Sequence, residues 1–375
     1  MQYSRTIEKQ LLNAYGQWKA IIIYGARQVG KTTLCKKLWW NKQETLFVTW
    51  DDFFTVEFLS NISLPQLQLW VKNYKTVIID EAQKIKNIGN TIKLIVDNIP
   101  EVQVIATWSS SFDLANHIVE PLTWRTRTFY LYPLSIEEIL ENVPMHYHKQ
   151  YLNSLLNYGC YPSIVNNNNV DDLLELVQAY TYKDIFLYES LKKPDLIVKL
   201  LQALALQIWS EVSYRELWTL LSVDVKTIQK YLALLEQAFI IFRLSSFSRN
   251  LRNELKMGQK IYFRDVGIRN GLIHNIQDIT MRSDIWHLRE NFIIAERLKF
   301  LQNHGIHYNP FFWRTTAGSE IDFLETDFWS LLNTYEIKRS EKKNPSLPQA
   351  FKEWYENCTY QVINPKNFYE VIQRK

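Results

Sequence analysis

The sequence predicts an α/β protein of several domains that begins with a parallel, three-layer α/β domain. Over residues 1–143, apolar strand-like segments alternate with helical segments, which is the pattern of a parallel sheet covered by helices. A glycine-containing loop follows the first of these strands, and two acids end a later one. The length of 375 residues is more than one hydrophobic core usually organises, so two or three domains are expected.

The loop at residues 25–33 reads GARQVGKTT and stands between an apolar segment, 20–24, and a helical segment, 34–38. The spacing G-x-x-x-x-G-K-T in this strand–loop–helix context is typical of a phosphate-binding loop, and the context disfavours a surface turn that matches by chance. Glycines let backbone amides turn toward a phosphate. We expect Lys31 to reach the β- and γ-phosphates of ATP, and Thr32 to place its hydroxyl on Mg²⁺.

Two acids follow the apolar strand at residues 76–80, and a further strand is expected at 45–49. Asp80 can hold the Mg²⁺ shell, and Glu81, just beyond the strand, can polarise the attacking water. An apolar run that ends in acids is weak evidence alone, but it gains weight after a phosphate-binding loop.

A hydroxyl-rich segment, 107–111, follows another buried-type strand at 102–107. Its hydroxyls, Ser109 among them, would lie beside the γ-phosphate or would cap the helix expected at 112–118; both roles stay open. Arg125, before the strand at 128–132, is a candidate for contact with the γ-phosphate, in cis or across a subunit interface. As a lone arginine it could equally be a structural ion-pair residue. The residues expected to bind the nucleotide are Gly25, Gln28, Val29, Gly30, Lys31, Thr32, Thr33 and Ser109, and those expected in catalysis are Glu81, Asp80 and Arg125.

The middle of the chain is expected to be helical. Residues 144–206 carry apolar residues at helical spacing and are interpreted as a helical linker or lid. In 207–250, Ser213 and Asp224 can each cap a short helix, and an extended segment follows, which is a winged-helix order. Its second helix would expose Lys226, Gln229 and Lys230, with Arg243, Arg249 and Arg252 following. This face would contact the phosphates of a duplex, or would be a solvated face of an interaction module.

The last segment, 251–375, contains a second group of charges. Glu290 lies on an expected helix, 285–301, whereas Asp322 and the pair Glu336 and Lys338 lie on expected strands. Side chains alternate along a strand, so Glu336 and Lys338 point to one face. Carboxylates on paired strands with a lysine can hold a second Mg²⁺ and activate water against a phosphodiester. The alternative is an inherited fold whose charges form surface ion pairs.

The composition limits the possible classes of protein without indicating a function. The net charge of +4 permits nucleic-acid binding without indicating it. Three separated cysteines match no metal-binding spacing and suit a reducing, cytoplasmic setting. The first residues lack the apolar region of a signal peptide, and no apolar run is long enough to span a bilayer, so no membrane partner is expected.

The motifs together resemble the prokaryotic AAA-type ATPases that carry a C-terminal DUF4143 domain. In the first part, the resemblance rests on the 25–33 loop, IIDEAQ at 78–83, SSS at 109–111 and YPLS at 132–135. It continues with SYREL at 213–217, LLE at 234–236, FSRNL at 247–251, KIYF at 260–263 and DVGIRN at 265–270. ENF at 290–292, EID at 320–322 and EIK at 336–338 complete it and cover nearly the whole chain. The C-terminal part also resembles the restriction-endonuclease-like core.

These observations predict an AAA-like P-loop domain (1–143), helices (144–206), a winged helix (207–250) and a nuclease-like α/β DUF4143 domain (251–375). The expected function is an ATP-binding, ATP-hydrolysing, Mg²⁺-dependent switch that is coupled to DNA or RNA and can form a homo-oligomer. Two alternatives remain: an ATP-gated, metal-dependent nuclease, and an assembly module that binds nucleotide without hydrolysing it.

Tryptophan is unusually frequent, with 13 Trp against 10 Gly. Glycine normally makes up about 7% of a chain, and it suits tight turns because it reaches positive φ without strain. Seven tryptophans stand at expected turns or element ends: Trp18, Trp50, Trp108, Trp124, Trp209, Trp286 and Trp329. One hypothesis is that some are glycine in the native product, from a stop codon reassigned to glycine. Trp313, in a strand, would be genuine, and Trp108 would crowd the γ-phosphate. The alternative is a lineage rich in aromatic residues, which 21 Tyr and 19 Phe partly support.

Overall fold

A computed structural model gives the fold in two units, each with its own sheet. The first unit contains residues 1–134 with 237–239, and the second contains 135–236 and 240–375. The residues that the structure describes are 3–40, 44–109, 122–141, 143–179, 194–208, 210–248, 258–315, 317–327, 331–338, 345–355 and 357–372. Among these residues, no helix combines the length and the apolar character needed to cross a bilayer.

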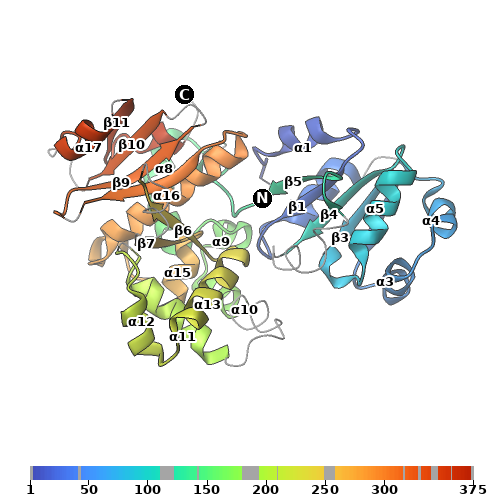
Figure 1. Ribbon diagram of the computed structural model, residues 1–375, viewed down its shortest axis with the longest axis horizontal. Helices are drawn as coiled ribbons and strands as arrows, with labels where there is room; N and C mark the ends of the chain where they lie inside the picture. Colours follow the sequence, from blue (N-terminus) through green and yellow to red (C-terminus); the bar gives the residue numbers. More distant parts are fainter. Residues whose placement is uncertain are drawn as a thin grey trace. The chain divides into compact units, whose positions relative to one another are not determined.

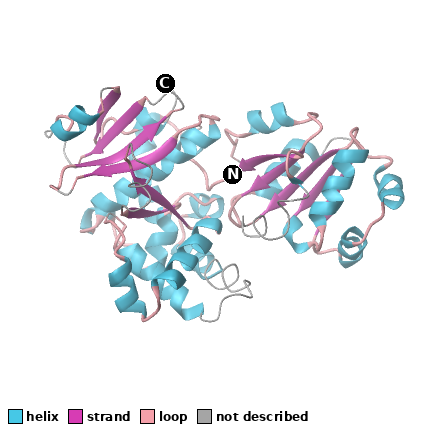
Figure 2. Ribbon diagram, in the orientation of Figure 1, coloured by secondary structure: helices cyan, strands magenta, loops and turns pink. Residues whose placement is uncertain are grey.

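The first unit is built on a five-stranded sheet in the order β2-β3-β4-β1-β5 (Figures 1 and 2). All four pairings are parallel. The strands are β1 (Ala20–Tyr24), β2 (Thr45–Thr49), β3 (Thr76–Asp80), β4 (Gln103–Trp108) and β5 (Thr126–Tyr130). The parallel α/β domain predicted from the sequence is confirmed. Its parallel strands need long crossovers, which is why helices separate them along the chain.

The helices of the first unit follow the strands. They are α1 (Glu8–Ala14), α2 (Lys31–Cys35), α3 (Phe53–Ser60), α4 (Leu64–Val71) and α5 (Ile88–Asn98), with a π-helical turn at Lys36–Trp40 and a 3₁₀ turn at Ala82–Lys84. The central strands β1, β3 and β4 are buried along their whole length, because helices and loops cover both faces of the sheet. The loops at the carboxyl ends of β1, β3 and β4 therefore meet at one edge of the sheet.

The second unit begins with helices and ends with a sheet (Figure 1). Its first helices are α7 (Ile136–Leu140), α8 (His148–Tyr158), α9 (Pro162–Asn167), α10 (Val170–Ala179), α11 (Pro194–Leu206), α12 (Tyr214–Leu221) and α13 (Val225–Gln237). The later ones are α15 (Val266–Leu272), α16 (Ile285–Asn303), α17 (Gln349–Trp354) and α18 (Tyr369–Ile372), and 3₁₀ turns lie at Met145–Tyr147 and Ile279–Met281.

A six-stranded mixed sheet in the order β11-β10-β9-β8-β6-β7 completes the second unit. The strands are β6 (Ile241–Ser246), β7 (Gln259–Phe263), β8 (Asn309–Arg314), β9 (Glu320–Thr326), β10 (Leu332–Ile337) and β11 (Cys358–Ile363). Strands β8, β9 and β10 form an antiparallel meander, and β11 adds to β10 in parallel after α17. Trp313, Leu324 and Phe351 belong to the core between this meander and α17.

The segment predicted as a winged helix has the expected helices, and the strand after them belongs to a larger sheet. Ser213 caps α12 by accepting from the amide of Glu216 at 3.2 Å, and Asp224 accepts from the amide of Thr227 at 3.0 Å at the start of α13. The strand that follows, β6, pairs with β7 and β8 and so belongs to the large sheet. Its apolar residues Ile241, Phe242 and Leu244 are buried within that sheet.

The structure describes four of the six residues expected on the basic face around α13. Lys226, Gln229 and Lys230 are exposed. Arg243, however, is ion-paired with Glu236, which accepts from its Nη2 at 2.5 Å. Arg249 and Arg252 lie outside the described residues.

Candidate functional site

The phosphate-binding loop is shaped by its two glycines. Gly30, at the N-cap of α2, has φ of +97°, a conformation that a larger residue adopts only with strain. At Gly25, a Cβ atom would lie 2.1 Å from the carbonyl oxygen of Leu131, so no side chain fits there. Gln28, in the middle of the loop, also has a positive φ of +61°. The loop therefore takes a strained, open turn that ends at the N-terminus of α2, where amides favour an anion.

Lys31 lies inside this turn and is buried. Its Nζ donates to the carbonyl oxygens of Gly25 and Ala26, both at 2.8 Å, and lies 3.8 Å from Oε1 of Glu81. An ammonium held in this way by loop carbonyls is free to exchange these partners for phosphate oxygens. The donors and the loop shape fit the phosphates of a nucleotide.

A network of hydroxyls and acid joins the ends of three neighbouring elements. Thr32, on α2, donates to the Asp80 carboxylate, 2.8 Å to Oδ2 and 3.0 Å to Oδ1. Thr107, on β4, donates to Oδ1 of Asp80 at 2.6 Å and accepts from the amide of Glu81 at 2.9 Å. A hydroxyl and a carboxylate at this distance are the oxygen ligands that Mg²⁺ takes beside phosphates. Thr32 and Asp80 thus fit the metal that the loop implies.

Glu81 has a left-handed backbone conformation, and its carboxylate is held by a hydrogen bond. Its φ is +52°, a left-handed conformation that is rare for a residue of this size, and its Oε2 accepts from Nε2 of Gln83 at 2.5 Å. The same amide of Gln83 donates to Oγ of Ser109 at 2.6 Å. Gln83 therefore connects the acid after β3 with the hydroxyl after β4. Ser110 and Ser111 lie outside the described residues.

Arg5 is a residue of this site that the motifs did not indicate. It is buried, and its guanidinium donates from Nη1 to the carbonyl of Val29 at 2.9 Å and from Nη2 to that of Tyr132 at 2.6 Å. These bonds hold the loop from outside, against the segment after β5. No local pattern could reveal this role, because the three residues are far apart along the chain.

The structure does not bring Arg125 to the loop within one chain. It precedes β5, and its carbonyl accepts from the amide of Ala20 at 2.9 Å, so it lies at the amino end of β1. The loop leaves the carboxyl end of the same five-residue strand, about 17 Å away at 3.3 Å per residue. Nε of Arg125 donates to Asp97 at 2.6 Å, which is the structural ion pair considered as the alternative.

Trp108 also differs from expectation. It ends β4 instead of standing in a turn, and its indole is fully buried against Tyr24, with ring centroids 5.8 Å apart. Its carbonyl accepts from the amide of Gly25 at 3.2 Å. A side chain packed into the core does not crowd the γ-phosphate, so the expected crowding is not supported.

The second unit gathers four of the predicted charges in one place. Asp322 accepts from the amide of Ile337 at 2.8 Å, which holds its carboxylate at the end of β10, near Glu336 and Lys338. Lys338 forms an ion pair with Oε1 of Glu336, whose Oε2 is buried and has no hydrogen-bond partner among the described residues. Burial, with repulsion from Asp322, raises the pKa of both Glu290 and Glu336 to about 7. The pKa of Asp322 itself is raised, chiefly by burial.

Two further residues of this acid cluster were not predicted as site residues. Lys260 is buried and forms ion pairs with Glu320 and, at 3.8 Å, with Glu290, whereas Tyr262 donates to Oε1 of Glu290 at 2.7 Å. Both come from β7, where residues two apart share a face. In the described ranges, no group of three or more His, Cys, Asp or Glu side chains is spaced to hold a metal ion. Lys260 and Lys338 form ion pairs with the acids of this cluster.

Comparison with known families divides the chain in three. Residues 17–140 match the AAA domain family AAA_14, and residues 287–373 match DUF4143, a domain of unknown function. Residues 149–279, between them, match another domain of unknown function, DUF8612. The first and last matches confirm the resemblance drawn from the motifs.

Similar proteins extend over most of the chain. Uncharacterized proteins of Mycobacterium bovis and Mycobacterium tuberculosis are each 23% identical over 368 residues, which cover 93% of this chain and 76% of theirs. Among solved structures, the Walker-type ATPase of Pyrococcus abyssi is 13% identical, with 71% of this chain and 94% of that chain covered and a TM-score of 0.48.

Proposed function

We propose that this chain, an AAA-type P-loop protein with a C-terminal DUF4143 domain, binds and hydrolyses ATP with Mg²⁺ and acts as a cytoplasmic switch. The contact of Thr32 and Thr107 with Asp80, beside the buried Lys31, carries the proposal. It puts a phosphate-binding cation, a metal-binding acid and a hydroxyl within one network.

Each residue has a role that its contacts support. Lys31 moves from the loop carbonyls to the β- and γ-phosphates, and Thr32 and Asp80 hold Mg²⁺, which neutralises charge on the phosphates. Glu81, next to Asp80, accepts a proton from the attacking water. Gln83 donates to both the Glu81 carboxylate and the Ser109 hydroxyl, and a γ-phosphate would offer Ser109 and Gln83 a new partner.

Replacing Lys31 tests nucleotide binding. Lys31→Ala removes the only ammonium inside the described loop, which now makes two charge-assisted hydrogen bonds. Because a pair of such bonds to the phosphates would be lost, we expect ATP affinity to fall at least about a hundredfold. Binding of a fluorescent ATP analogue measures it. Lys72→Ala, at an exposed lysine after α4, is the matched control and should bind as the wild type does. Unchanged affinity in Lys31→Ala would exclude this site.

Replacing Glu81 separates hydrolysis from binding. Glu81→Gln keeps the hydrogen-bonding shape but cannot take a proton, so we expect normal ATP affinity and turnover slower by about a hundredfold or more. Steady-state phosphate release with and without DNA or RNA measures this, and it also shows whether nucleic acid is the partner. Turnover at the wild-type rate would overturn the role of Glu81. An inactive wild type that assembles with ATP would favour the assembly module.

A second candidate function is metal-dependent cleavage of a phosphodiester. The order α16–β8–β9–β10–α17–β11, with an antiparallel meander and a parallel last strand, supports the restriction-endonuclease-like core. Burial and repulsion from Asp322 raise the pKa of Glu290 and Glu336, and a divalent cation would relieve this repulsion. Lys338 would then leave Glu336 and stabilise the reacting water.

Replacing Lys338 tests this second function. If the cluster cleaves nucleic acid, nicking of a plasmid with Mg²⁺ or Mn²⁺ should be lost in Lys338→Ala and kept in Lys352→Ala, an exposed lysine on α17. Both variants lose one positive charge, so a difference between them reports the cluster. Nicking that persists in Lys338→Ala would point to a contaminant and would refute the nuclease function.

A further inference from the structure

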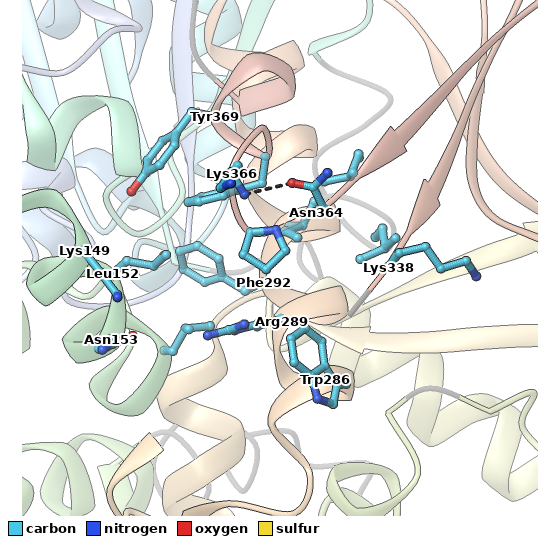
Figure 3. Close-up of a pocket in the computed structure, with 16 residues that line it drawn as sticks. Lys149, Leu152, Asn153, Trp286, Arg289, Phe292, Lys338, Asn364, Lys366 and Tyr369 are labelled. Carbon is cyan, nitrogen blue, oxygen red and sulfur yellow. Dashed lines mark hydrogen bonds between the residues drawn. The ribbon is translucent and has the colours of Figure 1, made fainter. Parts of the chain in front are cut away.

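A cavity of about 360 Å³ opens in the second unit, next to the acid cluster but distinct from it (Figure 3). Residues of α8 and α16, the ends of β10 and β11 and the segment after β11 form its walls. Lys149 comes from α8; Trp286, Arg289 and Phe292 come from α16; and Lys366 and Tyr369 come from the segment after β11. Its size is at the lower end of the range for ligand pockets, which suits one small ligand and not a folded partner.

The cavity has positive charge and no negative charge. Four of its 16 lining residues are basic, and none is Asp or Glu. The ammonium of Lys338 runs away from the cavity to Glu336, whereas Lys149, Arg289 and Lys366 line its walls (Figure 3). Three cations around one cavity without an acid favour an anion.

Arg289 is the most informative of these cations. In the part of the chain that the structure describes, its guanidinium has no hydrogen-bond or ion-pair partner, and its Nε is buried without one. The ring of Trp286 lies 4.8 Å from it. Burial alone lowers the pKa of Arg289. Arg289 is half-buried, and its buried Nε has no acceptor among the described residues, so a bound anion would supply the partner that this donor lacks.

The rest of the lining is apolar and aromatic. Phe292, Phe368 and Tyr369, with Trp286, offer ring faces beside the cations. A ligand that fits both parts carries a flat ring and a phosphate. Bases stack on aromatic side chains, and Arg binds phosphate with two parallel hydrogen bonds.

We propose that this cavity binds one phosphate-bearing nucleotide unit, with the phosphate on Arg289 and Lys149 and the base against the aromatic wall. The unit comes from a single strand of nucleic acid. Ile337 and Lys338 line the cavity and directly follow Glu336 in the chain. A nucleic-acid strand bound in the cavity would therefore continue toward the acid cluster. The proposal does not depend on ATP hydrolysis or on cleavage.

Replacing the two cations tests the proposal in the full chain. Arg289→Met keeps the stem that packs beside Trp286 but removes the charge, and Lys149→Met does the same from a different helix. Fluorescence anisotropy of a labelled oligothymidylate should show affinity about ten- to a hundredfold weaker for Arg289→Met and several-fold weaker for Lys149→Met. Lys352→Met, exposed on α17, is the control and should bind as the wild type does.

The outcomes are distinguishable. Circular dichroism checks that each variant is folded. If Arg289→Met does not fold, the affinity of Lys149→Met tests the proposal in its place. Competition by thymidine monophosphate, measured in a Lys31→Ala background to silence the loop site, identifies the source. Competition near the oligonucleotide's own affinity would assign the cavity to a free nucleotide, and weak competition would assign it to a strand. Wild-type binding in both cavity variants, or an equal loss in Lys352→Met, would overturn the proposal.

Discussion

At the scale of single residues, two tryptophans adopt a backbone conformation that suits glycine. Trp18 has φ of +54° and Trp124 has φ of +67°, and their side chains are 67% and 85% exposed. Neither indole gains burial in return for its strained backbone. At these two positions, the backbone therefore agrees with the hypothesis that some tryptophans are glycine in the native product. Trp209 and Trp329 lie outside the described residues.

Trp124→Gly should therefore stabilise the first unit. Removing a bulky residue from the left-handed region gains about 1–2 kcal/mol, and the greater freedom of glycine in the unfolded chain offsets part of it. We expect a net gain of about 1 kcal/mol in the free energy of unfolding, measured by urea denaturation. Trp313→Gly, in the core of the second unit, is the opposite control and should lose about 3–5 kcal/mol.

A destabilised Trp124→Gly would remove the structural support for the hypothesis. Intact mass of protein from its natural source tests the hypothesis itself: a mass that agrees with 13 Trp would refute it. This measurement does not depend on which individual positions are affected.

Residues that act through a local pattern could be predicted from the sequence, and others could not. Lys31, Thr32 and Asp80 were found because their spacing follows from a loop and a strand end, and the structure joins them. Arg5 and Lys260 were missed as site residues, because their roles depend on partners distant along the chain. Burial of a charge is a tertiary property, and no window of sequence contains it.

At the scale of elements, the apolar pattern of the sequence predicted where strands lie better than it predicted which strands pair. The bounds of β1, β2 and β3 agree with the apolar segments 20–24, 45–49 and 76–80. The pairing of β6 with β8 was not foreseen, because 62 residues separate the two strands and pairing is decided by the completed sheet. The helices of the winged-helix interpretation are present, and the strand that follows them is part of a six-stranded sheet, so the winged helix itself stays a prediction.

A buried ion pair ties one helix to the start of another. Glu296, on α16, accepts from Nζ of Lys299 at 2.6 Å and, through its other oxygen, from the amide of Ile136 at the start of α7 at 2.7 Å. Burial raises the pKa of Glu296, and the Lys299 ammonium opposes that rise. The pair therefore positions α7 while it satisfies two buried charges.

Breaking this pair from one side should destabilise the second unit. Lys299→Met leaves Glu296 buried and unpaired, so we expect a loss of about 3–5 kcal/mol in the free energy of unfolding. The double variant Glu296→Gln with Lys299→Met keeps an acceptor for Ile136 and should recover most of the loss. Lys37→Met breaks the more exposed pair with Glu8 and should change stability by less than about 1 kcal/mol. A small loss in Lys299→Met would contradict this account.

At the scale of the whole molecule, the two units have separate sheets and separate candidate sites. ATP binds, in our proposal, only in the first. Saturation at a hundred times the dissociation constant stabilises a binding unit by about 2.7 kcal/mol. Calorimetry should show two unfolding transitions, with Mg²⁺–ATP raising the temperature of the one that belongs to the first unit. The shift should vanish in Lys31→Ala, and a shift that persists there would place ATP elsewhere.

The hydroxyl of Thr107 touches two consecutive residues that have different tasks. It donates to the carboxylate of Asp80 and accepts from the amide of Glu81. Any rotation of Asp80 as a metal arrives would pull on Thr107, and Thr107 would pass that movement to the backbone that carries Glu81. A nucleotide that binds without Mg²⁺ would then leave the Glu81 carboxylate hydrogen-bonded to Gln83 instead of activating water. ATP hydrolysis in the absence of the metal would therefore be suppressed.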